Sequence, residues 1–241
     1  MNDLNPVHNI GGYIAAGDTK AALRAIGREF HSRGWSLGTS SNYSVITRRE
    51  PIELLITASG KDKSSLTDND FVSVDAEGNL LDRNSAESNP GTGSKSSAET
   101  LLHCLIAECV SEAGAVLHTH SVWGTTLSRR ALQPNESLGT LRIEGYEMLK
   151  GLEGIKTHET TIDVPVFRNS QDMNELSDRI RRVLQPTCQS ETENRQLHGF
   201  LLAGHGLYTW GKSLAEARRH IEIFEFLFEV TAQQKILSLC P

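Results

Sequence analysis

The sequence predicts an α/β fold in which helices cover a mostly antiparallel sheet. Two patterns alternate along the 241 residues: amphipathic segments with helical spacing and short runs rich in β-forming residues. Several of these runs are separated only by turn-like segments, which favours hairpins over the long crossovers of a parallel sheet. Helices and strands are therefore interleaved, but a doubly wound parallel sheet is not expected.

The first half of the chain contains two predicted helices. One is expected over 19–34, with Asp18 as its N-cap and Gly34 as its end. Short strands follow at 43–47, 52–58 and 71–75, and the turn Ala-Glu-Gly-Asn after the last one predicts a hairpin. The second helix, over 97–114, carries an apolar stripe and leads directly into a strand at 115–119.

The second half repeats the alternation. In chain order we expect a helix over 143–152, a strand over 161–167, a helix over 172–184, a polar loop over 185–196, and two short strands within 199–211 around a Gly-His-Gly bend. Ser213 and Glu216 form a capping box that opens a long final helix.

Composition limits the classes of function. A chain of this length, 38% hydrophobic and 22% charged, is expected to be one globular domain over 1–241. A net charge of −6 argues against a nucleic-acid surface, and no apolar run is long enough to span a membrane. No signal-peptide pattern opens the chain, and the four cysteines never form CxxC, so we expect reduced thiols and a cytoplasmic location.

Two segments look like phosphate loops but fail the pattern. The segment 89–97 places a serine between glycine and lysine, and 59–65 follows Gly-Lys with aspartate. Neither matches the GxxxxGK[ST] loop, and no GxGxxG motif links a strand to a helix. The sequence therefore predicts neither a nucleotide hydrolase nor a dinucleotide-binding fold.

The most informative motif is His118-Thr119-His120 at the end of a buried strand. Residues two apart on a strand point to the same side, so both imidazoles project together. Two such nitrogens can bind one metal ion, and catalytic zinc usually takes a third protein ligand. The competing interpretation is an ordinary polar strand end.

The best candidate for the third ligand is His205, which follows another apolar run. It lies between Gly204 and Gly206, which allow a tight bend and a close approach of the backbone. Glu99 and Glu147 are the candidate acid/base carboxylates near a metal; a first-turn or solvated glutamate is the commoner role and the alternative for each.

Three short segments rich in Ser, Thr and Gly complete the pattern: 38–42, 57–61 and 95–99. The last lies at a predicted helix N-terminus, where free N–H groups favour an anion. Small hydroxyl side chains and a lysine fit a phosphate monoester. Three ordinary loops are the alternative.

In this order, GTSSN, TASGK, KSSAE, HTH and AGHG resemble the class II aldolase/adducin family, over about 19–235. The resemblance implies a three-layer α/β/α domain with a mostly antiparallel central sheet, forming a homotetramer with active sites near subunit interfaces. It implies one zinc ion per subunit on His118, His120 and His205. It assigns the substrate phosphate to six residues: Ser40, Asn42, Ser59, Gly60, Ser96 and Ser97. The chain has Ser97-Ala98-Glu99 where sugar-phosphate aldolases often have Ser-Ser-Glu.

Two details are similar to one branch of this family. The segment GYEMLKGL matches the branch's acid/base glutamate at Glu147, and the tail from 205 to 230 is also similar, although the spacing from HTH to Glu147 is longer here. This branch dehydrates 5-methylthioribulose 1-phosphate in methionine salvage. Glu147 is then the expected main acid/base, and Glu99, which matches the aldolase branch's glutamate, is the alternative base. Retro-aldol cleavage of a ketose 1-phosphate and a non-catalytic scaffold remain the alternative functions.

Overall fold

The protein folds around one eight-stranded sheet. The computed structural model describes residues 16–81, 95–185 and 196–239. The strand order is β3-β2-β1-β4-β8-β7-β6-β5, and only the β6–β7 pair is parallel. The strands are β1 (Asn42–Arg49), β2 (Ile52–Thr57), β3 (Phe71–Asp75), β4 (Ala115–Thr119), β5 (Leu138–Glu144), β6 (Thr161–Phe167), β7 (Gly199–Leu202) and β8 (Gly206–Gly211). The predicted mostly antiparallel sheet is confirmed.

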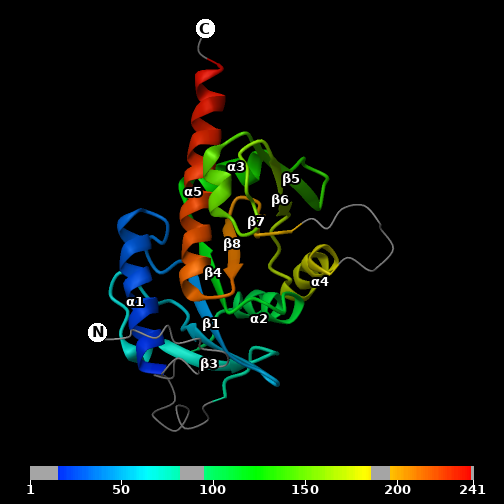
Figure 1. The fold of residues 1–241 in the computed structure, drawn as a ribbon. Coiled ribbons are helices and arrows are strands. Elements are labelled where there is room, and N and C mark those ends of the chain that lie inside the picture. The colour runs from blue at the N-terminus through cyan, green and yellow to red at the C-terminus, as the bar shows by residue number, and fades with distance from the viewer. Residues whose placement is uncertain (1–15, 82–94, 186–195, 240–241) are drawn as a thin grey trace, which may run out of the picture.

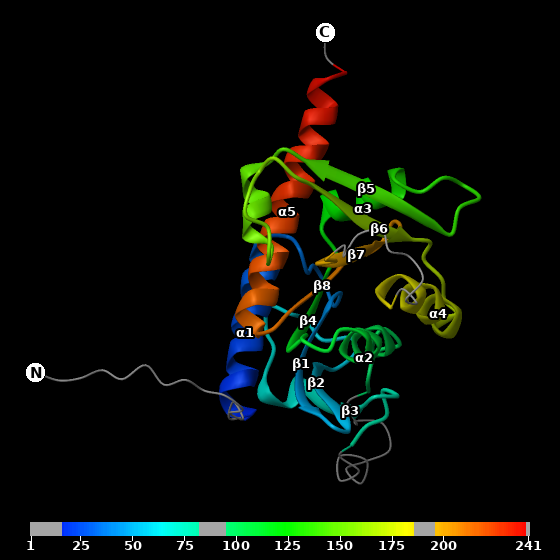
Figure 2. The same ribbon diagram turned by 45° about the vertical axis from the view of Figure 1, so that its right-hand side comes forward.

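Helices cover both faces of this sheet and give the predicted three layers (Figures 1 and 2). One face carries α1 (Ala16–Ser32), α5 (Leu214–Leu237) and the short 3-10 helix η3 (Glu147–Gly151). The other carries α2 (Thr100–Cys109) and α4 (Met173–Leu184). The helix α3 (Val122–Arg130) packs beside α5, and the 3-10 helix η1 (Asp68–Asp70) precedes β3.

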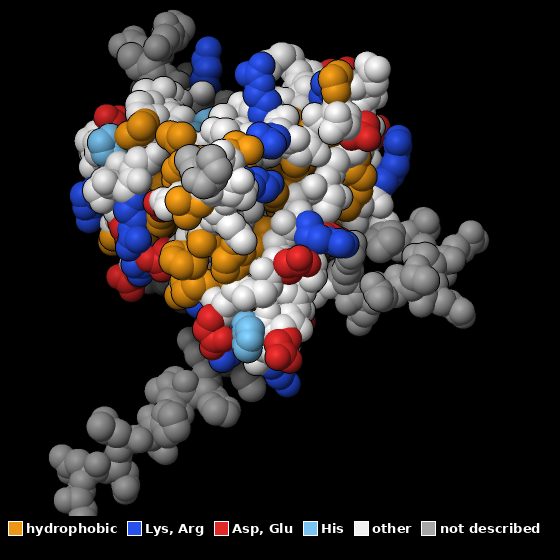
Figure 3. All heavy atoms as spheres, turned by 90° about the horizontal axis from the view of Figure 1, so that it is seen from above, with side chains coloured by type: hydrophobic (Ala, Val, Ile, Leu, Met, Phe, Trp, Pro, Cys, Tyr) orange, Lys and Arg blue, Asp and Glu red, His pale blue; other side chains and the backbone are white. Residues whose placement is uncertain are grey.

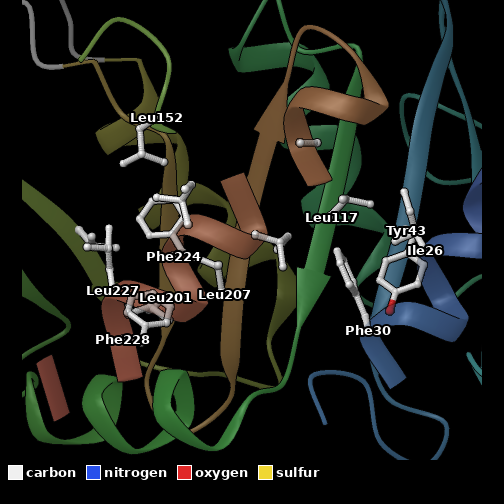
Figure 4. Packing of buried hydrophobic residues seen from close by; sticks show 14 of the residues in the cluster. Ile26, Phe30, Tyr43, Leu117, Leu152, Leu201, Leu207, Phe224, Leu227 and Phe228 are labelled. Atoms are coloured by element: carbon white, nitrogen blue, oxygen red, sulfur yellow. The ribbon is translucent and has the colours of Figure 1, made fainter. Parts of the chain in front are cut away.

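Each face has its own hydrophobic core. On the α5 face, Phe224, Leu227 and Phe228 pack toward Leu201 and Leu207 of the sheet (Figure 4). The α2 face is built mainly on the leucine and isoleucine stripe of α2 and the aromatic side chains of β7 and β8. Burial of these apolar surfaces is the main force that holds the layers together.

Strand β4 lies near the middle of the sheet and all five of its residues are buried. Its alternation sends the Thr119 side chain toward α5, where the Thr119 hydroxyl donates to a carboxylate oxygen of Glu225 at 2.9 Å. Glu225 is 3% exposed, and its burial raises the pKa of the carboxyl to about 7 despite hydrogen bonds from Ser121 and Thr119.

Three sequence-based expectations were wrong. The predicted helix over 143–152 is instead the end of β5 followed by η3, because β5 pairs with β6 along its whole length and Gly145 turns the chain with φ +77. The helix α3 was not predicted. Ser121 caps this helix by accepting a hydrogen bond from the Gly124 N–H, and the buried Leu127 packs it against the core. The first helix begins at Ala16, so Asp18 lies in its first turn and is not the N-cap.

Several boundaries agree with the prediction. Ser213 caps α5 by accepting a hydrogen bond from the Glu216 N–H at 3.2 Å. Most of the predicted loop over 185–196 lies outside the described residues. In the described part of the chain, no helix has both the length and the apolarity to cross a membrane.

The buried Glu225 carboxyl leads to a prediction about stability. An unfolded glutamate ionises near pH 4.5, whereas the folded one ionises near pH 7. The folded state therefore binds the proton more tightly, and this group's contribution to the free energy of unfolding falls as pH rises from about 4.5 to above 7, by about 3 kcal/mol. Glu225→Gln keeps an acceptor for Thr119 and cannot ionise, so it should stabilise the protein at pH 8 but not at pH 4.5.

Urea unfolding at both pH values, at one fixed protein concentration, measures this difference. Glu229→Gln on the exposed side of the same helix is the matched control and should behave like the parent protein. A Glu225→Gln variant with the same offset at both pH values would show that the carboxyl does not titrate in the folded core.

Candidate metal centre and substrate cavity

The two histidines of the HTH motif project to the α2 face of the sheet, opposite Thr119. His118 pairs in register with Asn42 of β1 on one side and with Tyr208 of β8 on the other. Its ring stacks on the Tyr208 ring, with centroids 3.9 Å apart and planes 12° apart. His120 follows the strand directly, and its N–H donates to the Trp35 carbonyl at 2.8 Å. The HTH backbone is therefore fixed on both sides of Thr119.

His205 reaches the same place from the turn between β7 and β8. Gly204 has φ +68, which favours glycine. A Cβ on Gly206 would lie 2.0 Å from the Thr119 carbonyl oxygen, so only glycine lets β8 approach β4 this closely. The two glycines that flank His205 have the roles that the sequence predicted.

Three imidazole nitrogens converge on one point. The Nε2 atoms of His118 and His120 lie 2.7 Å apart, and those of His120 and His205 lie 3.1 Å apart. Ligand atoms of these histidines and of Glu99 all lie within 4.8 Å of one another. The structure thus brings together the three predicted ligands and one of the two candidate carboxylates.

The protonation of the rings fits a cation. His118 Nδ1 lies 2.8 Å from the Leu207 carbonyl oxygen, which can only accept, so Nδ1 carries the proton and the Nε2 lone pair faces the cluster. Burial, together with the neighbouring histidines, lowers the pKa of His118 well below its usual value. Burial and the charge of His205 lower the pKa of His120 to about 4. Neutral imidazoles with converging lone pairs are the donor set that zinc and similar ions bind.

Glu99 stands at the start of α2 with its carboxylate against this cluster. Its oxygens lie 2.9 Å from His205 Nε2 and 3.9 Å from His118 Nε2, and they accept from the Asn42 amide at 3.2 Å. Burial alone would raise the pKa of Glu99, but the hydrogen bond and charge of His205 outweigh it and lower the pKa. Glu99 is therefore an ionised carboxylate that is 24% exposed.

A cavity of about 380 Å³ opens beside the cluster. His120, His205 and Glu99 line one part of it. Five of the six predicted phosphate residues also line it, namely Ser40, Asn42, Ser59, Gly60 and Ser97. Segments far apart in the sequence meet here, and the Ser59 N–H donates to the Lys95 carbonyl at 2.8 Å. The cavity has the hydroxyl and amide groups that a phosphate monoester needs.

Ser96 is the exception among the predicted phosphate residues. It does not line the cavity, and its hydroxyl donates to the Gly78 carbonyl at 3.4 Å. Its neighbour Ser97 accepts from the Glu99 N–H at 3.2 Å, which caps the turn that leads into α2. The structure therefore places Ser97, but not Ser96, at the cavity, because adjacent residues in this turn point in different directions; the assignment of Ser96 to the phosphate stays a prediction.

The structure separates Glu147 from the histidines. Glu147 begins η3, whose Leu149 packs with α5, so it lies on the face of the sheet opposite to the metal cluster. Its carboxylate is 69% exposed and bonds Lys150 at 2.6 Å and His158 at 3.3 Å. The hydrogen bond and charge of Lys150 lower the pKa of Glu147. Within one chain, Glu147 and the three histidines do not form one site.

Sequence reasoning missed one group of residues at the cavity and a buried lysine that interacts with Glu99. The cavity is also lined by Asn169, Ser170, Gln171 and Met173, and the polar segment directly after the strand at 161–167 was a usable signal. Lys63 is fully buried, donates to the Lys61 carbonyl at 2.6 Å, and interacts electrostatically with Glu99. Burial lowers the pKa of Lys63 to about 8. Lys63 belongs to the segment 59–65, which the sequence analysis considered only as a nucleotide phosphate loop and rejected.

Comparisons with known proteins agree with this geometry. Among curated relatives, methylthioribulose-1-phosphate dehydratase of Pseudomonas fluorescens is 44% identical over 84% of this chain and 86% of its own. The Azotobacter vinelandii protein of that name is 43% identical over 88% and 92%.

Solved structures show the same fold at lower identity. An L-fuculose 1-phosphate aldolase matches with a TM-score of 0.69 and 21% identity, covering 94% of this chain and 91% of its own. The L-fuculose-1-phosphate aldolase of Thermus thermophilus matches with a TM-score of 0.67 and 22% identity, covering 94% and 100%. The model of the class II aldolase and adducin N-terminal domain matches residues 21–232. The chain therefore belongs to the class II aldolase and adducin family.

Proposed function

We propose that this protein is a hydro-lyase that removes water from 5-methylthioribulose 1-phosphate and yields 2,3-diketo-5-methylthiopentyl 1-phosphate, a step of methionine salvage. The observation that carries the proposal is one cavity that joins three imidazole nitrogens, the Glu99 carboxylate and the Ser/Gly loops. Relatives with the dehydratase name match 84–88% of the chain at 43–44% identity. The absence of CxxC and the free thiols of Cys104 and Cys109 support a cytoplasmic location.

The metal is assigned as one zinc ion per chain. His118, His120 and His205 would hold it, because a ring nitrogen of each faces one point and burial lowers the pKa of His118 and His120. When bound there, zinc would supply Lewis acidity that makes the proton on the carbon beside a substrate ketone easier to remove. The nitrogen donors suit zinc, and three protein ligands leave a position open for substrate.

The cavity orients the substrate by its phosphate. Ser40, Ser59 and Ser97 offer hydroxyl groups, and Gly60 offers an uncovered backbone. Glu99, the N-cap of α2, lines the same cavity, so the positive end of this helix dipole lies near a bound anion. A phosphate bound at these loops places the rest of a short sugar phosphate beside His120, His205 and Glu99. Binding energy from the phosphate then positions the reacting carbons.

Dehydration requires one proton to leave carbon and one to reach the departing hydroxyl. Glu99 is ionised and stands at the metal cluster, so within one chain it is the carboxylate placed to take a proton. Asn42 and His205 hold its oxygens in position. The second carboxylate is Glu147, which we assign as the main acid/base and which must come from another copy of the chain.

An oligomer would bring Glu147 to a site. The Glu147 side chain is exposed on the same side of the sheet as α5. Seen from the C-terminal end of α5, the surface of the protein carries a group of hydrophobic side chains (Figure 3). Exposed apolar residues on this helix and its end include Phe226, Ile236, Leu237 and Leu239. Such a face fits contact between copies, and we assign the expected homotetramer to it. Each site then takes its metal ligands from one copy and Glu147 from its neighbour.

Retro-aldol cleavage of a ketose 1-phosphate is the second candidate. One observation favours it: Glu99, which matches the aldolase branch's base, lies at the metal cluster, whereas Glu147 lies on the opposite face. Both reactions use the same cavity and the same kind of substrate. They differ in the bond that breaks, which is carbon–oxygen in dehydration and carbon–carbon in cleavage.

Product analysis tests the reaction. The purified protein is incubated separately with 5-methylthioribulose 1-phosphate and with fuculose or rhamnulose 1-phosphate. We expect the first substrate to lose one water and keep its carbon chain, because the site is proposed to break the C4–oxygen bond. Mass spectrometry of the products measures this. Formation of a three-carbon phosphate and an aldehyde would show that the protein is an aldolase.

Metal analysis tests the ligand set. The parent protein should carry about one zinc ion per chain, and His120→Ala should lose both the metal and activity because two ligands hold zinc poorly. Glu147→Gln, on the other face of the sheet, is the control and should keep its zinc while losing activity. Zinc content that stays far below one per chain, with no gain in activity on adding zinc, would favour a non-catalytic scaffold.

Subunit mixing tests the assignment of Glu147. The variants His120→Ala and Glu147→Gln are each expected to be inactive. When the two are co-expressed in equal amounts, a site with ligands from one copy and Glu147 from the next should form at about a quarter of the positions. Activity near a quarter of the parent value is expected. Continued inactivity of the mixed, zinc-loaded protein would place Glu147 in its own chain's site, and an active Glu147→Gln homo-oligomer would transfer the base to Glu99.

A further inference from the structure

The turn that carries His205 is tied to α3 by two hydrogen bonds. The Thr125 hydroxyl donates to the His205 carbonyl at 2.8 Å, and the Gly204 N–H donates to the Ser128 hydroxyl at 3.1 Å. The Ser128 hydroxyl in turn donates to the Thr125 carbonyl at 3.0 Å. A single helix thus holds both the residue that bears the third imidazole and the residue before it.

This helix also begins at the other two ligands. Its N-cap, Ser121, directly follows His120, so α3 is a rigid continuation of the HTH segment. Through Thr125 and Ser128, α3 therefore links the backbone that bears His118 and His120 to the turn that bears His205. In the sequence, His120 and His205 lie 85 residues apart. The connection through α3 spans only the first two turns of the helix.

The ring of His205 depends on its backbone more than the ring of His118 does. The Leu207 carbonyl fixes His118 through Nδ1. The Nδ1 atom of His205 is buried and, among the described residues, has no hydrogen-bond partner. Metal-binding histidines are usually oriented by a partner on the second ring nitrogen, and for His205 the described part of the chain supplies none. The His205 imidazole is therefore oriented by its Nε2 contacts with Glu99 and His120 and by the position of its main chain.

We propose that Thr125 and Ser128 are positioning residues of the metal centre, which hold the His205 turn so that the third imidazole is in place before the metal binds. The inference rests on the proposed metal site. Ser128 is fully buried and its hydroxyl bridges the Gly204 N–H and the Thr125 carbonyl, so it has no freedom to turn away. Thr125 needs only its hydroxyl for the contact, and its methyl group is dispensable.

Metal affinity measured by competition with a chelator tests the proposal. Thr125→Val keeps the shape of the side chain but removes the donor, and zinc affinity should fall about tenfold, the lower end of what partners of metal ligands contribute. Ser128→Ala should weaken zinc similarly. Thr125→Ser keeps the hydroxyl and should bind zinc like the parent protein. Thr126→Val, on the same helix, is the matched control, because the exposed Thr126 hydroxyl donates to the Val122 carbonyl of its own helix and does not contact the His205 turn among the described residues.

The cobalt-loaded protein gives a second readout. The visible absorption of Co²⁺ reports the number of ligands, and Thr125→Val should shift the spectrum toward that of His205→Ala, whereas Thr125→Ser should not. Thermal unfolding of the metal-free variants separates positioning from general stability. A Thr125→Val protein that is less stable without metal, but binds zinc as tightly as the parent, would overturn the proposal.

Two further outcomes are informative. Equal weakening by Thr125→Val and Thr125→Ser would also overturn the proposal, because the hydroxyl would then not be the group that matters. If His205→Ala binds zinc like the parent protein, the metal site of the proposed function is itself wrong. If His205→Ala weakens zinc and Thr125→Val does not, only the positioning role of α3 fails. The two failures are therefore distinguishable.

Discussion

Strand β4 is buried on both faces, so each of its side chains must pack or form hydrogen bonds with the helix layer toward which it projects. Its alternation places His118 and His120 against α2 and places Thr119 against Glu225 of α5. Every other part of the site is arranged around this strand. β1 supplies Asn42 beside His118, and β8 supplies Tyr208 on the opposite side. A shift of one residue in register would exchange the two faces and remove the metal centre.

Burial also sets the charge of the site. Burial and the neighbouring histidines lower the pKa values of His118 and His120, so both rings favour the neutral form. Glu99 is the counterpart, because the hydrogen bond and charge of His205 lower its pKa in spite of its burial. The cluster thus combines imidazole nitrogen donors with one negative oxygen donor, which is a suitable environment for a divalent cation.

The two candidate carboxylates lie in different parts of the chain. The metal ligands, Glu99 and most of the predicted phosphate residues surround one cavity of a single chain. Glu147 stands on the opposite face, on a short helix packed against α5. If this residue takes part in the reaction, contact between copies is a requirement for catalysis as well as a source of stability. The exposed apolar residues of α5 offer a surface for that contact.

The sequence by itself determined the features that depend on near neighbours. Strand alternation paired His118 with His120, the glycines around His205 marked a tight turn, and hairpin-like spacing predicted an antiparallel sheet. Long-range contacts decided the rest. Pairing with β6 extended β5 to Glu144, into the start of the segment 143–152 that was predicted as a helix. Packing against α5 stabilised a helix at Val122–Arg130 that was not predicted.

Only the tertiary structure placed Ser96 outside the cavity, Asn169 and Gln171 inside it, and Glu147 on the far face. The physical reason is that spacing along a chain fixes the direction of a side chain within one element, whereas the packing of layers fixes which elements meet.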